Sequence, residues 1–183
     1  VINLAGFTVT ETDGTQTQNF VASTNIEAQY DIVLSFTTSD GNAIDVNDYT
    51  AQTATVVTIL AGTTNVNIPI DILGDLITEP QETFTSDITL TNANAQQVSI
   101  STSNATATIN DNDPAELSIT GFTIDESEVG SVVANFTITL NKTVQNAFTV
   151  DFATSDIEAL AGSDYTAVAT TTLNFGAANP FVQ

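Results

Sequence analysis

The stretch GFTVTE at residues 6–11 recurs as GFTIDE at residues 121–126, and this repetition decides the organisation of the chain. Two further blocks recur in the same order: FTTSD (36–40) as FATSD (152–156), and DYTA (48–51) as DYTA (164–167). The first pair is offset by 115 residues (121 − 6), and the other two pairs are offset by 116 (152 − 36 and 164 − 48). A repeat of this length has the size of one β-sandwich domain.

Within each repeat, apolar side chains recur at every second position. Ile68, Ile70 and Ile72 alternate with polar or turn-forming neighbours, and the runs 106–109 and 136–140 have the same pattern. These short runs lie between clusters of Gly, Asn and Asp, which is typical of a sandwich or barrel. No stretch shows the apolar stripe of an amphipathic helix, so the sequence predicts an all-β chain.

The boundary between the repeats is the segment NDNDP at residues 110–114. Pro114 cannot donate to a strand ladder and restricts Asp113 to an extended conformation, so the linker is short. We predict one sandwich over residues 1–113 and the N-terminal half of a second, incomplete sandwich over residues 114–183. Counterparts of residues 68–113 are missing from the second repeat. We expect further chain to complete it, and the alternative is a strand donated by a partner.

The charge of the chain is its most unusual property, because 22 acidic residues are present with one basic residue, a net charge of −21. Such a chain does not bind nucleic acid by neutralising phosphates, and it is repelled by anionic lipid. No apolar run is long enough for a transmembrane helix. The absence of Cys excludes disulfides and thiolate zinc sites. The carboxylates either form a solvated acidic surface or bind metal ions.

The first repeat contains an ordered series of acidic motifs: TVTETDG (8–14), TSDGNA (38–43), DY (48–49), IDILGD (70–75), EPQETF (79–84) and ATINDND (107–113). This series resembles the Calx-beta domain, which is known from the cytoplasmic loop of sodium–calcium exchangers and from large cell-surface proteins. The resemblance implies tandem immunoglobulin-like, antiparallel β-sandwiches that bind calcium among the loops at one end. The sequence departs from the exchanger pattern at Gly74, where an acidic residue is expected, and at Asn112, which interrupts an acidic triplet.

Carried over by position, the resemblance implies a set of calcium ligands: Glu11, Asp40, Asp75, Glu79, Glu82, Asp111 and Asp113 in the first repeat, and Glu126 and Asp156 in the second. Calcium takes about six to eight oxygen ligands, and extracellular calcium modules bind it at roughly 10⁻⁴–10⁻³ M. Without cations, so many adjacent carboxylates cannot all stay ionised. Aspartates also fix turns through their own backbone, and this is the role that we expect for Asp48 and Asp164.

These features together predict a calcium-binding structural or adhesive segment of an extracellular surface protein or filament, in which calcium stiffens the modules and their junction. The expected partners are calcium ions, neighbouring repeats of the same or an identical chain, and a host or surface ligand. The alternative is a calcium-dependent module that binds a glycan or protein ligand. An intracellular calcium sensor is less consistent with the sequence, and an enzyme is disfavoured because the chain has no His and no Cys.

Overall fold

The computed structural model describes residues 1–176, which form strands and no helix, as the sequence predicts. The chain divides into two compact units. The first contains residues 1–75 and 80–112, and the second contains residues 76–79 and the chain from residue 113 onward. The last seven residues of the predicted second module, 177–183, lie outside the described residues.

No helix that could cross a membrane is present in residues 1–176.

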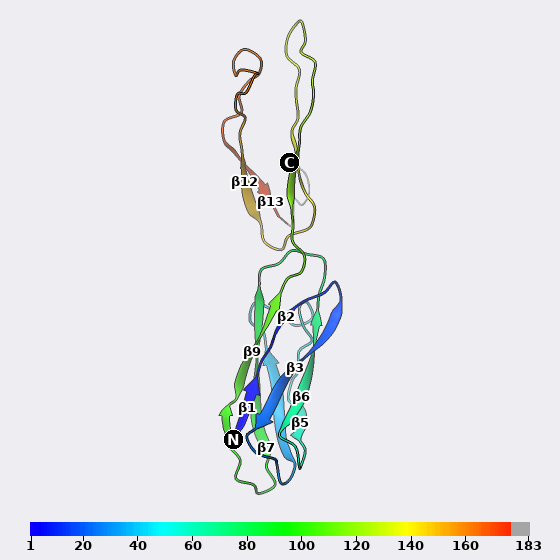
Figure 1. Cartoon of the computed structure of the whole chain (residues 1–183), viewed down its shortest axis with the longest axis vertical. Coiled ribbons are helices and arrows are strands. Elements are labelled where there is room, and N and C mark those ends of the chain that lie inside the picture. The colour runs from blue at the N-terminus through cyan, green and yellow to red at the C-terminus, as the bar shows by residue number, and fades with distance from the viewer. Residues whose placement is uncertain (177–183) are drawn as a thin grey trace. The chain divides into compact units, whose positions relative to one another are not determined.

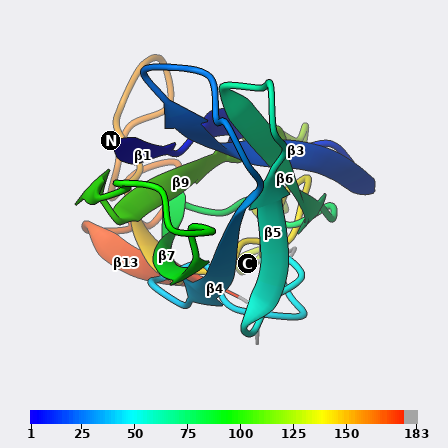
Figure 2. The same ribbon diagram turned by 90° about the horizontal axis from the view of Figure 1, so that it is seen from below.

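The first unit is a sandwich of two sheets (Figures 1 and 2). One sheet has the order β6-β3-β1-β8 and the other has the order β2-β9-β7-β4-β5. The strands are β1 (Ile2–Ala5), β2 (Thr8–Thr10), β3 (Thr15–Thr24), β4 (Ile32–Ser39), β5 (Thr55–Ile59), β6 (Asn65–Leu73), β7 (Glu82–Asn92), β8 (Ile100–Thr102) and β9 (Asn104–Asn110). Figure 2 shows β3 and β6 in one layer and β4 and β7 in the other.

The repeated Gly-Phe pair marks the place where the N-terminal segment changes sheets. β1 pairs with β3 and β8, whereas β2 pairs with β9 in the other sheet. Gly6 lies between them, and a Cβ atom there would lie 1.8 Å from the backbone oxygen of Thr106. Glycine therefore allows the close backbone approach that the crossing needs. The β1–β8 and β2–β9 pairs are parallel, and the other ladders of the described residues are antiparallel.

The core of the first unit follows from the period of two in the sequence. Along β6, Ile68, Ile70 and Ile72 are at most 2% exposed, while the residues between them face outward. Phe20 of β3 is fully buried, and its ring centroid lies 5.5 Å from that of Phe36. The two inward faces thus form one apolar layer, and its burial is the main force that stabilises the sandwich.

The second unit contains two strand pairs and a smaller core. β10 (Leu117–Thr120) pairs with β11 (Thr137–Leu140), and β12 (Phe148–Phe152) pairs with β13 (Thr171–Phe175). The buried core residues are Ile138, Leu140, Val144 and Phe175. Thr78 also belongs to this unit, because it forms a parallel bridge with Val144.

The strand registers of the two units agree residue for residue. β4 and β5 align Ile32 with Ile59, and β12 and β13 align Phe148 with Phe175, an offset of 116 in both strands (148 − 32 and 175 − 59). By this register, Leu173 is the equivalent of Val57. The repetition detected in the sequence is therefore a repetition of strand pairing.

A steric constraint explains why position 74 is glycine, where the family pattern has an acidic residue. A Cβ atom at this position would lie 1.7 Å from the backbone oxygen of Thr12, so any side chain would collide with the main chain. Gly14 is close in space, since the Gly74 amide donates to its carbonyl over 3.3 Å. A Cβ atom at Gly14, however, would have no atom within 4 Å.

We predict that Gly74→Ala lowers the free energy of unfolding by ~3 kcal/mol, because overpacking against backbone cannot be relieved by a rotamer change. The matched control Gly14→Ala should change it by no more than about 0.5 kcal/mol. Urea denaturation of the two variants and the wild-type chain measures both values. Equal stability of Gly74→Ala and the wild-type chain would contradict this explanation.

Candidate metal centre

The strand registers bring the acidic motifs of the first unit to one end of the sandwich. β2 pairs with β9 up to Thr10 and Asn110, so Glu11 and Asp111 follow directly beyond this end. β7 begins at Glu82, opposite Ile109 of β9. β4 ends at Ser39, opposite Thr85 of β7, so that Asp40 leaves the sheet at the same end. The convergence of distant loops that the sequence predicted is thus a result of strand pairing.

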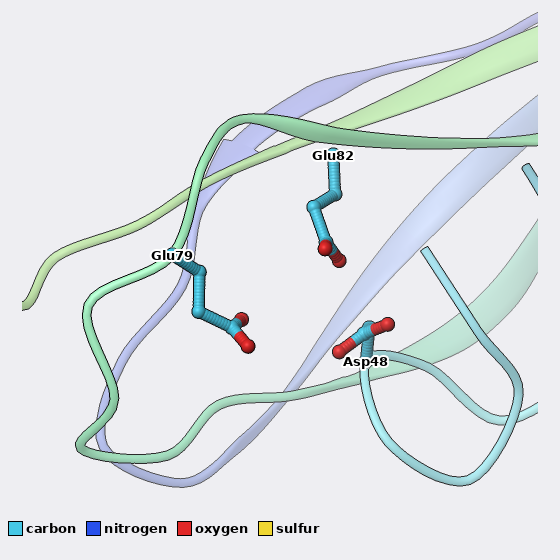
Figure 3. Close-up of side chains that lie close together, drawn as sticks. All are labelled: Asp48, Glu79 and Glu82. Carbon is cyan, nitrogen blue, oxygen red and sulfur yellow. The ribbon is translucent and has the colours of Figure 1, made fainter. Parts of the chain in front are cut away.

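Three carboxylates of the described residues lie close enough to share one cation. Asp48, Glu79 and Glu82 each offer an oxygen atom, and these atoms lie within 4.8 Å of one another. Figure 3 shows the three side chains pointing toward a common space. Glu82 is 5% exposed, whereas Asp48 and Glu79 are half-buried. Carboxylates this close repel one another unless a cation or a proton neutralises part of their charge.

The loop between β4 and β5 holds Asp48 in place. The Asp48 carboxylate accepts a hydrogen bond from the Ile44 amide over 2.6 Å. Asn42 joins this loop to the start of β7, because its side-chain oxygen accepts the Thr83 amide over 2.8 Å and its amide donates to the Gln81 carbonyl. The two chain segments that supply Asp48 and Glu82 are therefore connected by hydrogen bonds as well as by the core.

Asp40 and Asp156, both predicted calcium ligands, each accept a tyrosine hydroxyl. Tyr49 donates to Asp40 and Tyr165 donates to Asp156, both over 2.7 Å. Burial, followed by the hydrogen bond to Asp40, raises the pKa of the Tyr49 hydroxyl well above its usual range. The hydrogen bonds from Tyr165 and from the Ala161 amide lower the pKa of Asp156. Both tyrosines are thus protonated donors at neutral pH, and Asp156 is an ionised acceptor.

Asp113 has a cationic partner within the protein. The carboxylate of Asp113 is 3% exposed and forms an ion pair with Lys142, the one basic residue of the chain. Both residues belong to the second unit. Asn112, which interrupts the acidic triplet, donates from its side chain to Asp13 over 2.9 Å.

The other predicted ligands are placed as follows: Glu11 is buried, Asp111 is half-buried, and Asp75 and Glu126 are exposed. Of the nine predicted ligands, Glu79 and Glu82 lie in the three-carboxylate group. That any of the nine binds calcium stays a prediction. Sequence reasoning missed Asp48 as a member of this group, although it identified Asp48 as a loop-fixing residue. The available signal was the DY pair itself, which places Asp48 beside a tyrosine that the core buries.

The chemistry of the three-carboxylate group fits calcium. All three donors are carboxylate oxygens, the ligand type that calcium and magnesium prefer. Calcium tolerates irregular geometry and mixed ligands, whereas magnesium needs near-octahedral coordination and keeps its waters. Asp48, Glu79 and Glu82 would be the side-chain ligands of the site, and backbone carbonyls and water can supply the remaining ligands.

Comparison with known proteins identifies the fold and the family. The Calx-beta domain model matches residues 2–113 and again residues 116–181. The crystal structure of CBD12 from CALX1.2 is similar over 100% of this chain and 73% of that chain, with 21% sequence identity and a TM-score of 0.50. The calcium binding domain CBD12 of CALX1.1 is similar over 96% of this chain and 70% of that chain, with 18% identity and a TM-score of 0.50.

The crystal structure of the Calx CBD2 domain is similar over 61% of this chain and 86% of that chain, with 12% sequence identity and a TM-score of 0.50. At these identities the structural similarity shows the fold alone. No curated protein matches the chain. The two family matches cover most of the sequence and coincide with the two repeats, so the chain belongs to the Calx-beta domain family and carries two tandem copies of that domain.

Proposed function

We propose that this protein is a calcium-dependent structural or adhesive segment of an extracellular surface protein or filament, with its calcium bound at Asp48, Glu79 and Glu82. The observation that carries the proposal is the approach of three carboxylate oxygens to within 4.8 Å, one of them on a buried glutamate. Calx-beta domains are typically structural or binding modules that bind calcium and have no catalytic activity, which agrees with this arrangement.

The charge of the whole chain supports the same proposal. A net charge of −21 destabilises the compact state through self-repulsion, and bound divalent cations remove part of it where the carboxylates are closest. Calx-beta domains are known from large cell-surface proteins, and this occurrence is the basis for proposing an extracellular location. Extracellular calcium modules bind calcium at roughly 10⁻⁴–10⁻³ M, so this is the affinity that we expect.

We predict that calcium stabilises the wild-type chain by ~2.7 kcal/mol at a concentration 100 times the dissociation constant. Differential scanning calorimetry in calcium and in chelator measures this difference. Glu82→Gln should remove most of it, because the buried member of the cluster loses its charge. The matched control Glu27→Gln should keep it, since Glu27 is exposed in the loop between β3 and β4, at the other end of the first unit.

The calcium proposal is wrong if the wild-type chain melts at the same temperature in calcium and in chelator. Magnesium in place of calcium serves as the control for general screening of charge. If magnesium stabilises the chain as much as calcium does, the effect is electrostatic screening and not a calcium site.

The structural role makes a separate prediction about the junction. The linker NDNDP is short and contains Pro114, which restricts the backbone before it. If calcium stiffens the modules and their junction, small-angle scattering should show a larger maximum dimension and less flexibility in calcium than in chelator. Identical scattering profiles in both buffers would refute the stiffening.

An adhesive segment also needs a ligand, and a glycan and protein array in calcium buffer tests the alternative of a ligand-binding module.

A further inference from the structure

The two repeats contain the same hydrogen-bonded loop closure. In the first repeat, Asp40 Oδ1 accepts the Tyr49 hydroxyl over 2.7 Å and the Asp45 amide over 3.1 Å. In the second repeat, Asp156 Oδ1 accepts the Tyr165 hydroxyl over 2.7 Å and the Ala161 amide over 2.8 Å. Each residue of the second set lies 116 positions after its counterpart. We call each Tyr–Asp pair a tyrosine latch.

The backbone of each loop repeats as closely as the latch does. The Val46 amide donates to the Tyr49 carbonyl over 2.9 Å, and the equivalent Gly162 amide donates to the Tyr165 carbonyl over 2.8 Å. Gly162 has a φ of 89°, which glycine adopts without cost, whereas Val46 has a φ of 71°. A β-branched residue keeps such a φ only where the surroundings over-determine it. The hydrogen bonds of the loop therefore hold it in one conformation.

The latch of the first repeat is also packed into the core. Tyr49 is fully buried, and its ring stacks on Phe84 with a centroid separation of 3.8 Å and an interplanar angle of 3°. Asp48 directly precedes Tyr49, and Glu82 lies two residues before Phe84. The stacked rings thus fix the two chain segments that carry these carboxylates relative to each other. Loss of the latch should disturb Asp48 first, because it is adjacent to the latched residue.

We propose that the tyrosine latches close the loops 40–49 and 156–165 without calcium, and that Tyr49 is a positioning residue that sets Asp48 beside Glu82. The second clause rests on the proposed calcium function, and the first does not. Asp40 and Asp156 are then hydrogen-bond acceptors in this protein and not calcium ligands. The loops are ordered before an ion arrives, contrary to the disorder in chelator that carboxylate repulsion alone would produce.

Hydrogen exchange of the full chain in chelator tests the latch. Tyr49→Phe keeps the ring and removes the hydroxyl, so the amides of loop 40–49 should exchange about tenfold faster. A tenfold change corresponds to ~1.4 kcal/mol, which is near the net contribution of a hydrogen bond to a charged group. Tyr165→Phe should do the same to loop 156–165 and leave the first loop unchanged. The matched control is Tyr30→Phe, because Tyr30 is 53% exposed and outside both latches. It should change neither loop.

The latch is refuted if the wild-type loops are unprotected in chelator, or if neither Tyr49→Phe nor Tyr165→Phe accelerates exchange in its own loop. The two variants are independent, so a folding defect in one leaves the other to decide. Far-UV circular dichroism identifies such a defect.

Calcium titration calorimetry tests the positioning role. We expect Tyr49→Phe to weaken calcium binding about tenfold, and Asp40→Asn to change it by less than about twofold, because the amide oxygen accepts the same hydrogen bonds. If Asp40→Asn weakens binding as much as Glu82→Gln does, Asp40 is a ligand and this assignment is wrong. An unchanged affinity in Tyr49→Phe overturns the positioning role. If the wild-type chain binds no calcium, the proposed function fails, while the exchange experiment still decides the latch.

Discussion

Repulsion among carboxylates is the constraint under which this fold forms. The chain has 22 acidic residues and one basic residue, and strand pairing brings several of the acids to one end of the first unit. They cannot move apart, because the sheets that carry them share a core of buried Phe and Ile side chains. Each crowded carboxylate therefore needs a donor. The donors that the structure supplies are backbone amides, tyrosine hydroxyls, side-chain amides and one ammonium group.

The acidic residues differ in the partners that balance their charge. Asp40 accepts a tyrosine hydroxyl and a backbone amide, so donors within the protein already occupy its Oδ1 atom. An aspartate beside an ammonium, as Asp113 is, has its charge balanced within the protein. Asp48 and Glu79 also accept hydrogen bonds, from the Ile44 amide and the Gln145 side chain. Together with Glu82, however, they bring three carboxylate oxygens within 4.8 Å of one another. Local concentration of like charge, rather than the number of acids, distinguishes the candidate metal centre from the rest.

The fold was largely predictable from the sequence, because strand alternation and the 115–116-residue repeat are local or directly countable properties. The convergence of the loops at one end was also predictable, through the family resemblance. The membership of the site was not, since it depends on how side chains far apart in the sequence pack. Asp48 is the clearest example, because its neighbour Tyr49 stacks on Phe84, 35 residues away (84 − 49). A contact over this separation cannot be predicted from the local sequence pattern. The ion pair of Asp113 with Lys142 was missed for the same reason.

A loop that is closed in advance changes what calcium has to supply. When an ion orders a disordered loop, part of its binding free energy is consumed by the lost conformational freedom of that loop. In this protein, hydrogen bonds and a buried aromatic stack already hold the loop that carries Asp48. The cost that remains is the repulsion among three carboxylates, which the ion relieves directly. In the proposed site, three protein carboxylates would then suffice for moderate affinity in a first repeat where a side chain at position 74 would collide with the main chain and Asp40 accepts a tyrosine hydroxyl.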